Sequence, residues 1–412
     1  MIRSNLKRKD SSDTFLRILI VGYIFLSFFE HYLFSAYGSI TRYYIFLVIA
    51  VFIMKANRLT FHNYHGAIIG WLVYKFLSLS WTTDYAVFKR LVLTEVGFVA
   101  LLLCITAYNN SASILKALKK ATLYCSALMG ILSLFFSEPY HGEVVTRQVL
   151  TLFNIQNDPN NQAAFLLFGF SIALHSLLYT NKHKLLYVSI IIINAYTTLL
   201  TGSRAGLVSI LVITTAFLLT AYNPKTYKSS YMRFFVVAIL LVLASIVVFH
   251  FMPADVAGRL FTFEDYEGGS NRVSIWNYAL EILSNPINLI MGAGWGAYGD
   301  RSLHNTALSV LCDVGIIGFS LLFFPPAIAV LKMLKKKQVL TFAIFLSGMI
   351  PSFFIEAINK RFFWNTLIYV LVAYNCYLEE PKPAQAQTDS PTGSINGKKQ
   401  IQGVRKKCSY IK

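Results

Sequence analysis

Charged residues are scarce in this chain of 412 residues, and acidic residues are the scarcest. Asp, Glu, Lys and Arg together make up 14% of the sequence, and 19 acidic residues stand against 37 Lys and Arg. Hydrophobic residues make up 56%, and the mean hydropathy is +0.55. This composition excludes an ordinary water-soluble domain and predicts an integral membrane protein, whose solvent is mostly lipid.

Cysteines are few, and their arrangement argues against two kinds of site. The five cysteines are Cys104, Cys125, Cys312, Cys376 and Cys408. Four of them lie within or near apolar segments, and none has the spacing of a metal-ligand motif. We expect them to act as small hydrophobic residues rather than as a disulfide framework. Neither a metal ion nor another cofactor is predicted.

Apolar segments near the roughly 20 residues that cross a bilayer recur along the chain. We predict twelve spans, at residues 14–35, 43–54, 66–81, 91–107, 121–137, 162–180, 185–201, 206–221, 233–252, 305–331, 338–356 and 362–378. The second span is short and the third contains Lys75, so eleven spans is the alternative. The predicted fold class is therefore an all-α polytopic membrane protein with about twelve transmembrane helices.

Basic residues predict the orientation of these spans. An even number of spans places both termini on one side, and the basic start from Met1 to Asp10 indicates the cytoplasm. On this topology the cytoplasmic segments hold 25 of the 37 Lys and Arg residues, in short loops that face anionic lipid, so no nucleic-acid partner is predicted. The predicted regions are a cytoplasmic N-terminus at 1–13, a transmembrane domain at 14–378 and a disordered basic cytoplasmic tail at 379–412.

A polar interval at residues 253–304 is predicted to form a large loop on the side opposite the termini. It contains a helix-period apolar stripe on a segment too short to span, so we expect an amphipathic helix on the membrane surface. The stripe consists of Val273, Trp276, Ala279, Leu280 and Leu283. Arg272 falls in the first turn, where free backbone N–H groups and the helix dipole favour an anion. The alternative is a salt bridge from Arg272 to Glu264, Asp265 or Glu267.

His304 ends this interval, just before the tenth predicted span. A histidine at a membrane boundary is usually structural. Here Arg272 and Arg301 lie in the same segment, and an imidazole with an ordinary pKa near ~6.5 suits a general base beside phosphate-binding arginines. Asn305 can either cap the following helix or hold the imidazole tautomer.

Two other segments on the same side carry arginines. Arg204 lies in Thr201–Gly206. Because positive charge is disfavoured on the outer side, an anion-binding role for Arg204 competes with a simple topology anchor. Arg147 lies in Glu138–Asn161, whose turn Asn157–Asn161 is predicted to cap the next helix.

Six short segments follow one another in a characteristic order and spacing. They are Asp158-Pro159-Asn160, Thr201-Gly202-Ser203-Arg204-Ala205-Gly206, Gly269-Ser270-Asn271-Arg272 with Ile275-Trp276, Gly292-Ala293-Gly294, His304-Asn305-Thr306 and Gly315-Ile316-Ile317-Gly318. Together with the number of spans and the large polar loop, they resemble the O-antigen ligase and polymerase superfamily of bacterial membrane glycosyltransferases. No single segment is diagnostic, but the resemblance covers most of the chain.

The resemblance implies a GT-C-like, metal-independent, inverting glycosyltransferase of the bacterial inner membrane. Its donor would be a glycan carried on undecaprenyl diphosphate, and its active site would face the periplasm. By position, Arg204 and Arg272 match the arginines that hold the lipid diphosphate, and His304 matches the histidine that activates the acceptor hydroxyl. The secondary candidates, placed by location, are Arg147, Arg301, Asn305 and Arg361.

The acceptor decides between two activities within the superfamily. A polymerase extends one lipid-linked repeat unit with another, whereas a ligase moves the finished glycan to lipid A-core. The Asp-Pro-Asn turn and the Gly-Ser-x-Arg segment favour a polymerase of O-antigen or capsule. A lipid-linked oligosaccharide flippase shares the plan of about twelve spans and is the alternative from another class, but no internal repeat supports it. The other expected partners are membrane lipid and a candidate chain-length regulator.

Overall fold

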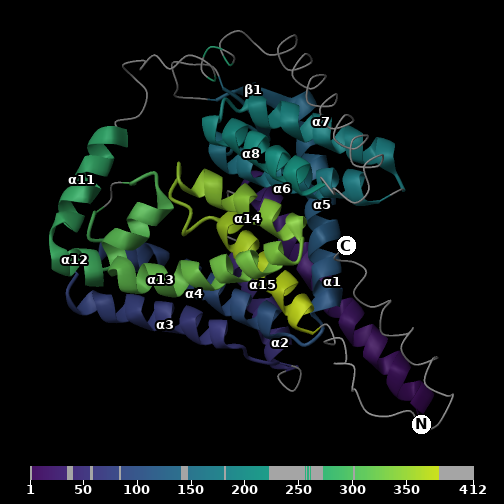
Figure 1. Cartoon of the computed structure of the whole chain (residues 1–412), viewed down its shortest axis with the longest axis horizontal. Helices are drawn as coiled ribbons and strands as arrows, with labels where there is room; N and C mark the ends of the chain where they lie inside the picture. The colour runs from purple at the N-terminus through teal and green to yellow at the C-terminus, as the bar shows by residue number, and fades with distance from the viewer. Residues whose placement is uncertain are drawn as a thin grey trace, which may run out of the picture.

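The described part of the chain is a bundle of helices (Figure 1). The computed structural model describes residues 2–34, 40–55, 59–82, 85–140, 147–180, 182–221, 256, 258, 260, 272–299 and 302–379. Its helices are α1 (Ile2–Phe34), α2 (Ile40–Ile53), α3 (Asn63–Leu77), η3 (Ser78–Ser80), α4 (Ala86–Ala107), α5 (Ser111–Phe136), α6 (Pro159–Tyr179), α7 (Lys184–Leu200), α8 (Arg204–Ala221), α11 (Arg272–Ser284), α12 (Pro286–Met291), α13 (Thr306–Lys335), α14 (Val339–Ser352) and α15 (Arg361–Leu378).

Eleven of the twelve predicted spans coincide with one of these helices, and the ninth, at 233–252, lies outside the described residues. Within the described ranges, five helices contain a stretch long and apolar enough to cross a membrane: α1, α4, α5, α6 and α13. The helices α2, α7, α8 and α14 are apolar but shorter. The described helices therefore agree with a polytopic membrane protein, while the count of twelve crossings stays a prediction.

Contacts made by α15 define the two ends of the bundle. Asn375, near the end of α15, accepts a hydrogen bond of 2.8 Å from Tyr64 at the start of α3. At the opposite end, Arg361 begins α15 and forms an ion pair with Glu30, near the end of α1. Glu30 also accepts a 2.6 Å hydrogen bond from the N–H of Thr41 at the start of α2. We call the end that contains Glu30, Thr41 and Arg361 the site end.

The helix α6 lies inside the bundle, packed against α5, α7, α8 and α14. Its sequence is apolar on all sides and 94% of its most apolar stretch is buried, which is the pattern of a core helix. Gly169 permits close approach, because a Cβ there would lie 2.3 Å from Ser126 Oγ of α5 and 2.6 Å from Asn194 Nδ2 of α7. Asn194 donates to Ser126 Oγ at 2.9 Å, so polar contacts reinforce the packing of the three helices.

The all-α prediction missed a small antiparallel sheet between α5 and α6. Its strands are β1 (Ser137–Pro139), β2 (Gln148–Leu152) and β3 (Ile155–Gln156), in the order β1-β2-β3. The turn from β2 to β3 has φ of 54° at Phe153 and 61° at Asn154, the left-handed values of a two-residue hairpin turn. Strands this short, with Phe rather than Gly or Asn in the first turn position, carry no pattern that distinguishes them from a loop.

The segment after α12 packs into a break in α13, beside α11 and α12 (Figure 1). At Gly315, φ is 59° and ψ is −167°, a conformation essentially restricted to glycine. A Cβ at Gly315 would lie 2.3 Å from Ile290 O. The carbonyls of Cys312 and Asp313, just before the break, accept hydrogen bonds of 2.8 and 3.1 Å from the N–H groups of residues 293 and 294. The loop thus replaces part of the hydrogen-bonding of the helix.

The predicted amphipathic helix is present as α11, but its apolar stripe has a different partner. Ala279 is buried and Leu283 is 8% exposed, in a cluster with Tyr298 and Cys312. Leu280, from the same stripe, is 56% exposed. The expectation that the whole stripe faces the membrane surface is wrong, because two of its members pack against protein.

Candidate functional site

His304 lies immediately before α13 in a left-handed backbone conformation, with φ of 48°. Its N–H donates to Ser302 Oγ at 3.4 Å. Asn305 caps α13, because its side chain accepts a 3.1 Å hydrogen bond from an N–H in the first turn. Thr306 donates to the carbonyl of Ile355 at 2.9 Å, which places this helix start at the site end. Of the two roles considered for Asn305, the structure shows the cap.

Charges from three separate segments act on His304. Burial lowers the pKa of this half-buried imidazole below its ordinary value of 6.5, and the guanidinium of Arg272 lowers the pKa further. The carboxylates of Asp158 and Glu356 act in the opposite direction. Trp276, one turn after Arg272 on α11, donates a 3.0 Å hydrogen bond to the carbonyl of Leu303, so α11 packs against the segment that ends at His304. A histidine with a lowered pKa is neutral at pH 7, which is the form that a general base requires.

Asp158 is positioned by its role as the N-cap of α6. Its carboxylate accepts hydrogen bonds from the N–H groups of Asn160 and Asn161, both at 2.9 Å. Pro159 occupies the first helical position, where its fixed φ and missing N–H cost nothing. The predicted cap within Asn157–Asn161 is therefore confirmed.

The turn before α8 is fastened to the start of α6. Ser203 Oγ donates to Asn160 Oδ1 at 2.8 Å. The buried guanidinium of Arg147 donates to the carbonyl of Thr201 at 3.0 Å and to Asn160 Oδ1 at 3.4 Å. Arg147 therefore supports this turn from within the protein, and its geometry is that of a positioning residue.

Arg204 begins α8 and has an exposed side chain. It lies at a helix N-terminus, where free N–H groups and the dipole favour a bound anion. The preceding residue, Ser203, is tied to Asn160, and Asp158 at the same helix start acts on His304. The turn that carries Arg204 is thus fixed to the start of α6.

Two secondary candidates remain, Arg361 and Arg301. Arg361 is ion-paired with Glu30, yet its side chain still contributes to the wall of a cavity. Arg301 lies outside the described residues.

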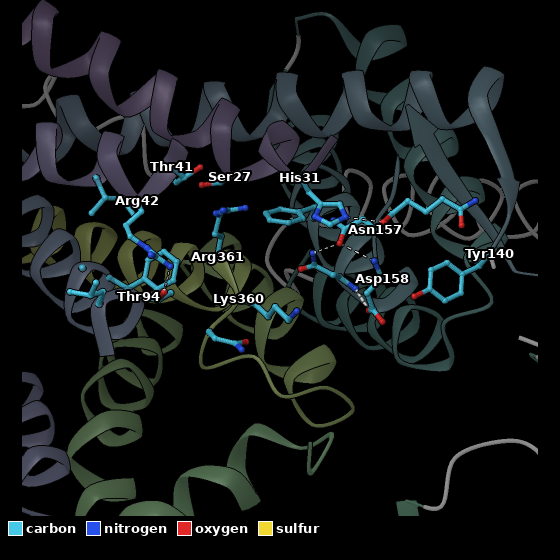
Figure 2. Close-up of a pocket in the computed structure, with 18 residues that line it drawn as sticks. Ser27, His31, Thr41, Arg42, Thr94, Tyr140, Asn157, Asp158, Lys360 and Arg361 are labelled. Atoms are coloured by element: carbon cyan, nitrogen blue, oxygen red, sulfur yellow. Dashed lines mark hydrogen bonds between the residues drawn. The ribbon is translucent and has the colours of Figure 1, made fainter. Parts of the chain in front are cut away.

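A cavity of about 370 Å³ is formed at the site end by residues of α1, α2, α4, α6 and α15, together with the segments before α6 and α15, and we call it the α1/α2 cavity (Figure 2). Figure 2 shows Arg42 and Thr94 on one side, His31, Asn157 and Asp158 on the other, and Arg361 and Lys360 between them. Arg42 donates to Thr94 Oγ1 at 3.2 Å, and the His31 ring is hydrogen-bonded to the carbonyl of Gln156 at 2.8 Å. The wall is therefore largely polar and cationic.

A second cavity, of about 160 Å³, adjoins the first. The two cavities share Asn359 and Lys360, and the wall of the smaller one also contains Ser302 and Glu356. Ser302, in the wall of the smaller cavity, accepts the N–H of His304, whereas His304 itself lines neither cavity.

Glu356 holds the backbone before His304. It accepts a 2.7 Å hydrogen bond from the hydroxyl of Tyr298 and a 3.2 Å hydrogen bond from Ser302 Oγ. Burial raises the pKa of Tyr298 well above its ordinary value of 10.0, so the phenol remains a donor. Glu356 thus fixes Ser302, and through it the position of His304.

A buried ion network lies behind the loop that leads to His304. Lys75 Nζ is 2.6 Å from Glu95 Oε2 and 3.3 Å from Asp313 Oδ2. The other oxygen of Asp313 accepts the N–H of Gly296 at 2.8 Å. The same ammonium lies 4.3 Å from the ring centre of Trp295. The network thus anchors the glycine-rich segment to α3, α4 and α13.

Sequence reasoning missed several residues of this region. They are Glu30, Arg42, Glu356 and Lys360. Asp158 was expected in a helix cap, but its electrostatic effect on His304 was not. Glu30 and Glu356 are carboxylates within predicted apolar spans, a rare and usually functional placement that could have identified them. Arg42 and Lys360 carried no such signal, because they are brought together only by the packing of α2 and α15 against α4.

Among the residues that the structure describes, no group of three or more His, Cys, Asp or Glu side chains is placed to hold a metal ion. The charged groups that act on His304 are Arg272, Asp158 and Glu356, and the wall of the α1/α2 cavity adds Arg42, Lys360 and Arg361. Such an arrangement suits recognition of an anion by hydrogen bonds and charge.

The fold and the site define a polytopic membrane protein with a cationic site at one end of its helix bundle. Residues 189–323 match the model of the O-antigen ligase family, which supports the O-antigen ligase and polymerase superfamily. The resemblance is thereby confirmed, and it supports a ligase- or polymerase-type role in polysaccharide biosynthesis. The matched range includes Arg204, Arg272 and His304. A comparison with curated proteins found no match.

Proposed function

We propose that the protein is an inner-membrane glycosyltransferase that moves a glycan from undecaprenyl diphosphate to an acceptor hydroxyl. The observation that carries this proposal is the contact of α11, which begins at Arg272, with the segment before His304, where Trp276 donates to the carbonyl of Leu303 at 3.0 Å. Arg272 and His304 lie in the range that matches the O-antigen ligase family. A neutral imidazole beside a guanidinium provides a base and an anion-binding group at one place.

The reaction is a displacement at the anomeric carbon of the donor. His304 takes the proton of the acceptor hydroxyl, whose oxygen forms a bond to the anomeric carbon. The bond from that carbon to the diphosphate oxygen breaks, and its electron pair leaves with the diphosphate. Arg272 and Arg204 hold the charge that develops on the leaving group, so the step as proposed requires no metal ion. Attack from the face opposite the diphosphate inverts the anomeric centre.

The proposed orientation places the site end at the periplasmic face and both termini in the cytoplasm. Support comes from the basic residues, because 25 of the 37 Lys and Arg lie in the segments assigned to the other side. A GT-C-like arrangement and contact with a chain-length regulator belong to the same proposal. Within the superfamily we favour the polymerase, on the Asp158-Pro159-Asn160 and Gly269-Ser270-Asn271-Arg272 segments.

The test is a transfer assay with purified protein and the lipid-linked repeat unit, with and without lipid A-core. Wild type is expected to form longer glycans from the repeat unit alone. His304→Ala is expected to lower turnover by about 10²- to 10⁴-fold, the usual contribution of a general base. Product only when lipid A-core is present would identify a ligase instead. No glycosidic product in either mixture would refute the transferase proposal.

His304→Gln serves as the companion variant, because it retains a polar side chain at a position with left-handed backbone. Both substitutions should leave the thermal unfolding of the protein nearly unchanged, since His304 is only half-buried. A loss of activity that follows a loss of folded protein would assign the residue a structural role.

A further inference from the structure

We propose that the α1/α2 cavity binds the diphosphate of a second lipid-linked glycan, which serves as the acceptor. The inference rests on the proposed glycosyl transfer and adds its second substrate. The donor diphosphate is assigned to Arg204 and Arg272, so this cavity is a separate cationic site. Its volume of about 370 Å³ lies within the range of small-molecule pockets, roughly 300 to 1,000 Å³.

The charge of the cavity wall favours a polyanion. Arg42, Lys360 and Arg361 contribute three positive side chains, against the single carboxylate of Asp158. Arg361 is already paired with Glu30. In the described part of the chain, Arg42 contacts the neutral Thr94 and neither Arg42 nor Lys360 has a carboxylate partner. Two uncompensated cations remain in a partly enclosed space, where they attract a diphosphate strongly.

The apolar part of the wall indicates that the anion is attached to a lipid. Ile45, Leu93, Phe98 and Phe165 line the cavity together with the cations. They come from α2, α4 and α6, and α4 and α6 are long and apolar enough to span a membrane. A soluble phosphate would leave these side chains without a matching ligand surface. A polyprenyl diphosphate offers both a charged head and an apolar chain at the membrane boundary.

The position of the cavity relative to His304 distinguishes acceptor from donor. A donor diphosphate must lie at the reacting carbon, whereas an acceptor diphosphate is separated from its reacting hydroxyl by the length of its glycan. Lys360 and Asn359 link the cavity to the smaller cavity beside Ser302, which contacts His304. His304 lines neither cavity, so a diphosphate held by Arg42 and Lys360 does not lie at the base, and we place the acceptor glycan between them.

The first experiment counts diphosphate sites on the full chain in neutral-lipid nanodiscs, with geranylgeranyl diphosphate as the probe. Wild type is expected to bind two equivalents. The double variant Arg42→Gln, Lys360→Gln is expected to keep one site and to bind at the other at least about tenfold more weakly. The control Lys89→Gln removes an exposed cation of α4 that does not line the cavity, and it should retain both sites.

Three results would overturn the inference: one equivalent in wild type, two unchanged sites in the double variant, or displacement of the second equivalent by phosphatidylglycerol. The last result would mean a general site for anionic lipid. If the double variant unfolds, Lys360→Gln alone is measured instead. It should show the same weakened second site, and it keeps the hydrogen bond from Arg42 to Thr94.

The second experiment separates this inference from the proposed function. The acceptor glycan is supplied either as the lipid-linked repeat unit or as an octyl glycoside without diphosphate. The cavity variants should raise KM for the lipid-linked acceptor by about tenfold and leave its kcat unchanged. Transfer to the octyl glycoside should keep the wild-type kcat and KM. Equal changes in KM for both acceptors, or no change for either, would overturn the role of the cavity. The proposed glycosyl transfer would not be contradicted by either result. If wild type forms no glycosidic bond, the proposed function fails, and the site count alone decides whether the cavity binds diphosphate.

Discussion

The protonation of His304 depends on charges that come from three different segments of the chain. Arg272 lowers the pKa of the imidazole, whereas Asp158 and Glu356 raise it, and burial is the largest cause of its lowered pKa. Asp158 and Glu356 therefore act on the base without a proposed contact to the substrate, whereas Arg272 is also assigned to the leaving diphosphate. This arrangement predicts opposite pH responses for substitutions of opposite sign.

Glu356→Gln should shift the acid limb of the kcat/KM profile to lower pH. Removing the carboxylate removes a charge that raises the pKa of His304, so the neutral base persists at lower pH. Arg272→Gln removes a charge that lowers the pKa, so the acid limb of its residual activity should shift to higher pH. The measurement is kcat/KM against pH, which reports groups of the free enzyme.

Lys89→Gln is the matched control for both variants, since Lys89 is an exposed cation on α4 outside both cavities. Its pH profile should coincide with that of wild type. Shifts of the same sign in Glu356→Gln and Arg272→Gln would contradict the assignment of the acid limb to His304.

The sequence predicts residues of the site well when one segment holds them together. Arg272 and His304 lie in a single predicted loop, and Asp158 with Pro159 forms a recognisable helix cap. Arg42 and Lys360 escape such reasoning because they reach the site by the packing of α2 and α15 against α4. Their places depend on contacts between residues distant in the chain, which periodicity does not encode.

At the scale of elements, the break in α13 controls how the loop before His304 returns to the bundle. Gly315→Ala should destabilise the protein by at least about 1 to 3 kcal/mol, because its conformation is essentially restricted to glycine. The added Cβ would also lie 2.3 Å from Ile290 O. Thermal unfolding in detergent measures the loss, and transfer activity should fall with it as α12 is displaced.

Gly66→Ala in α3 is the control, because a Cβ at Gly66 would meet nothing within 4 Å. Alanine in a helix interior is favoured over glycine by about 0.5 to 1 kcal/mol, so this variant should be at least as stable as wild type. Equal stability of the two alanine variants would show that the break in α13 is tolerant of a side chain.

Helix positions follow from the sequence because a long apolar run has one dominant solution in lipid. Eleven predicted spans coincide with helices for this reason. The break at Gly315 was not predicted, since glycine within an apolar span also indicates close helix packing. What distinguishes the two is the neighbouring loop, whose N–H groups of residues 293 and 294 bond the carbonyls before the break.

At the scale of the whole molecule, one buried ion network joins segments that the sequence separates by more than two hundred residues. Lys75 in α3 contacts Glu95 in α4 and Asp313 in α13, and Asp313 binds the N–H of Gly296. Lys75 and Glu95 are 1% and 0% exposed. Because α13 also begins beside His304, the network links the framework of the bundle to the position of the base.

Lys75→Met should therefore weaken both folding and catalysis. Removing the ammonium leaves Glu95 and Asp313 buried without their cation, a change that costs about 3 to 5 kcal/mol in comparable buried pairs. Lys89→Met, at an exposed position, should change stability by less than about 0.5 kcal/mol. Adding Glu95→Gln to Lys75→Met should recover part of the loss, because one of the two unpaired carboxylates is then neutral. Thermal unfolding of wild type, Lys75→Met, Glu95→Gln and the double variant measures this coupling. Additive effects of the two substitutions would contradict a direct ion pair.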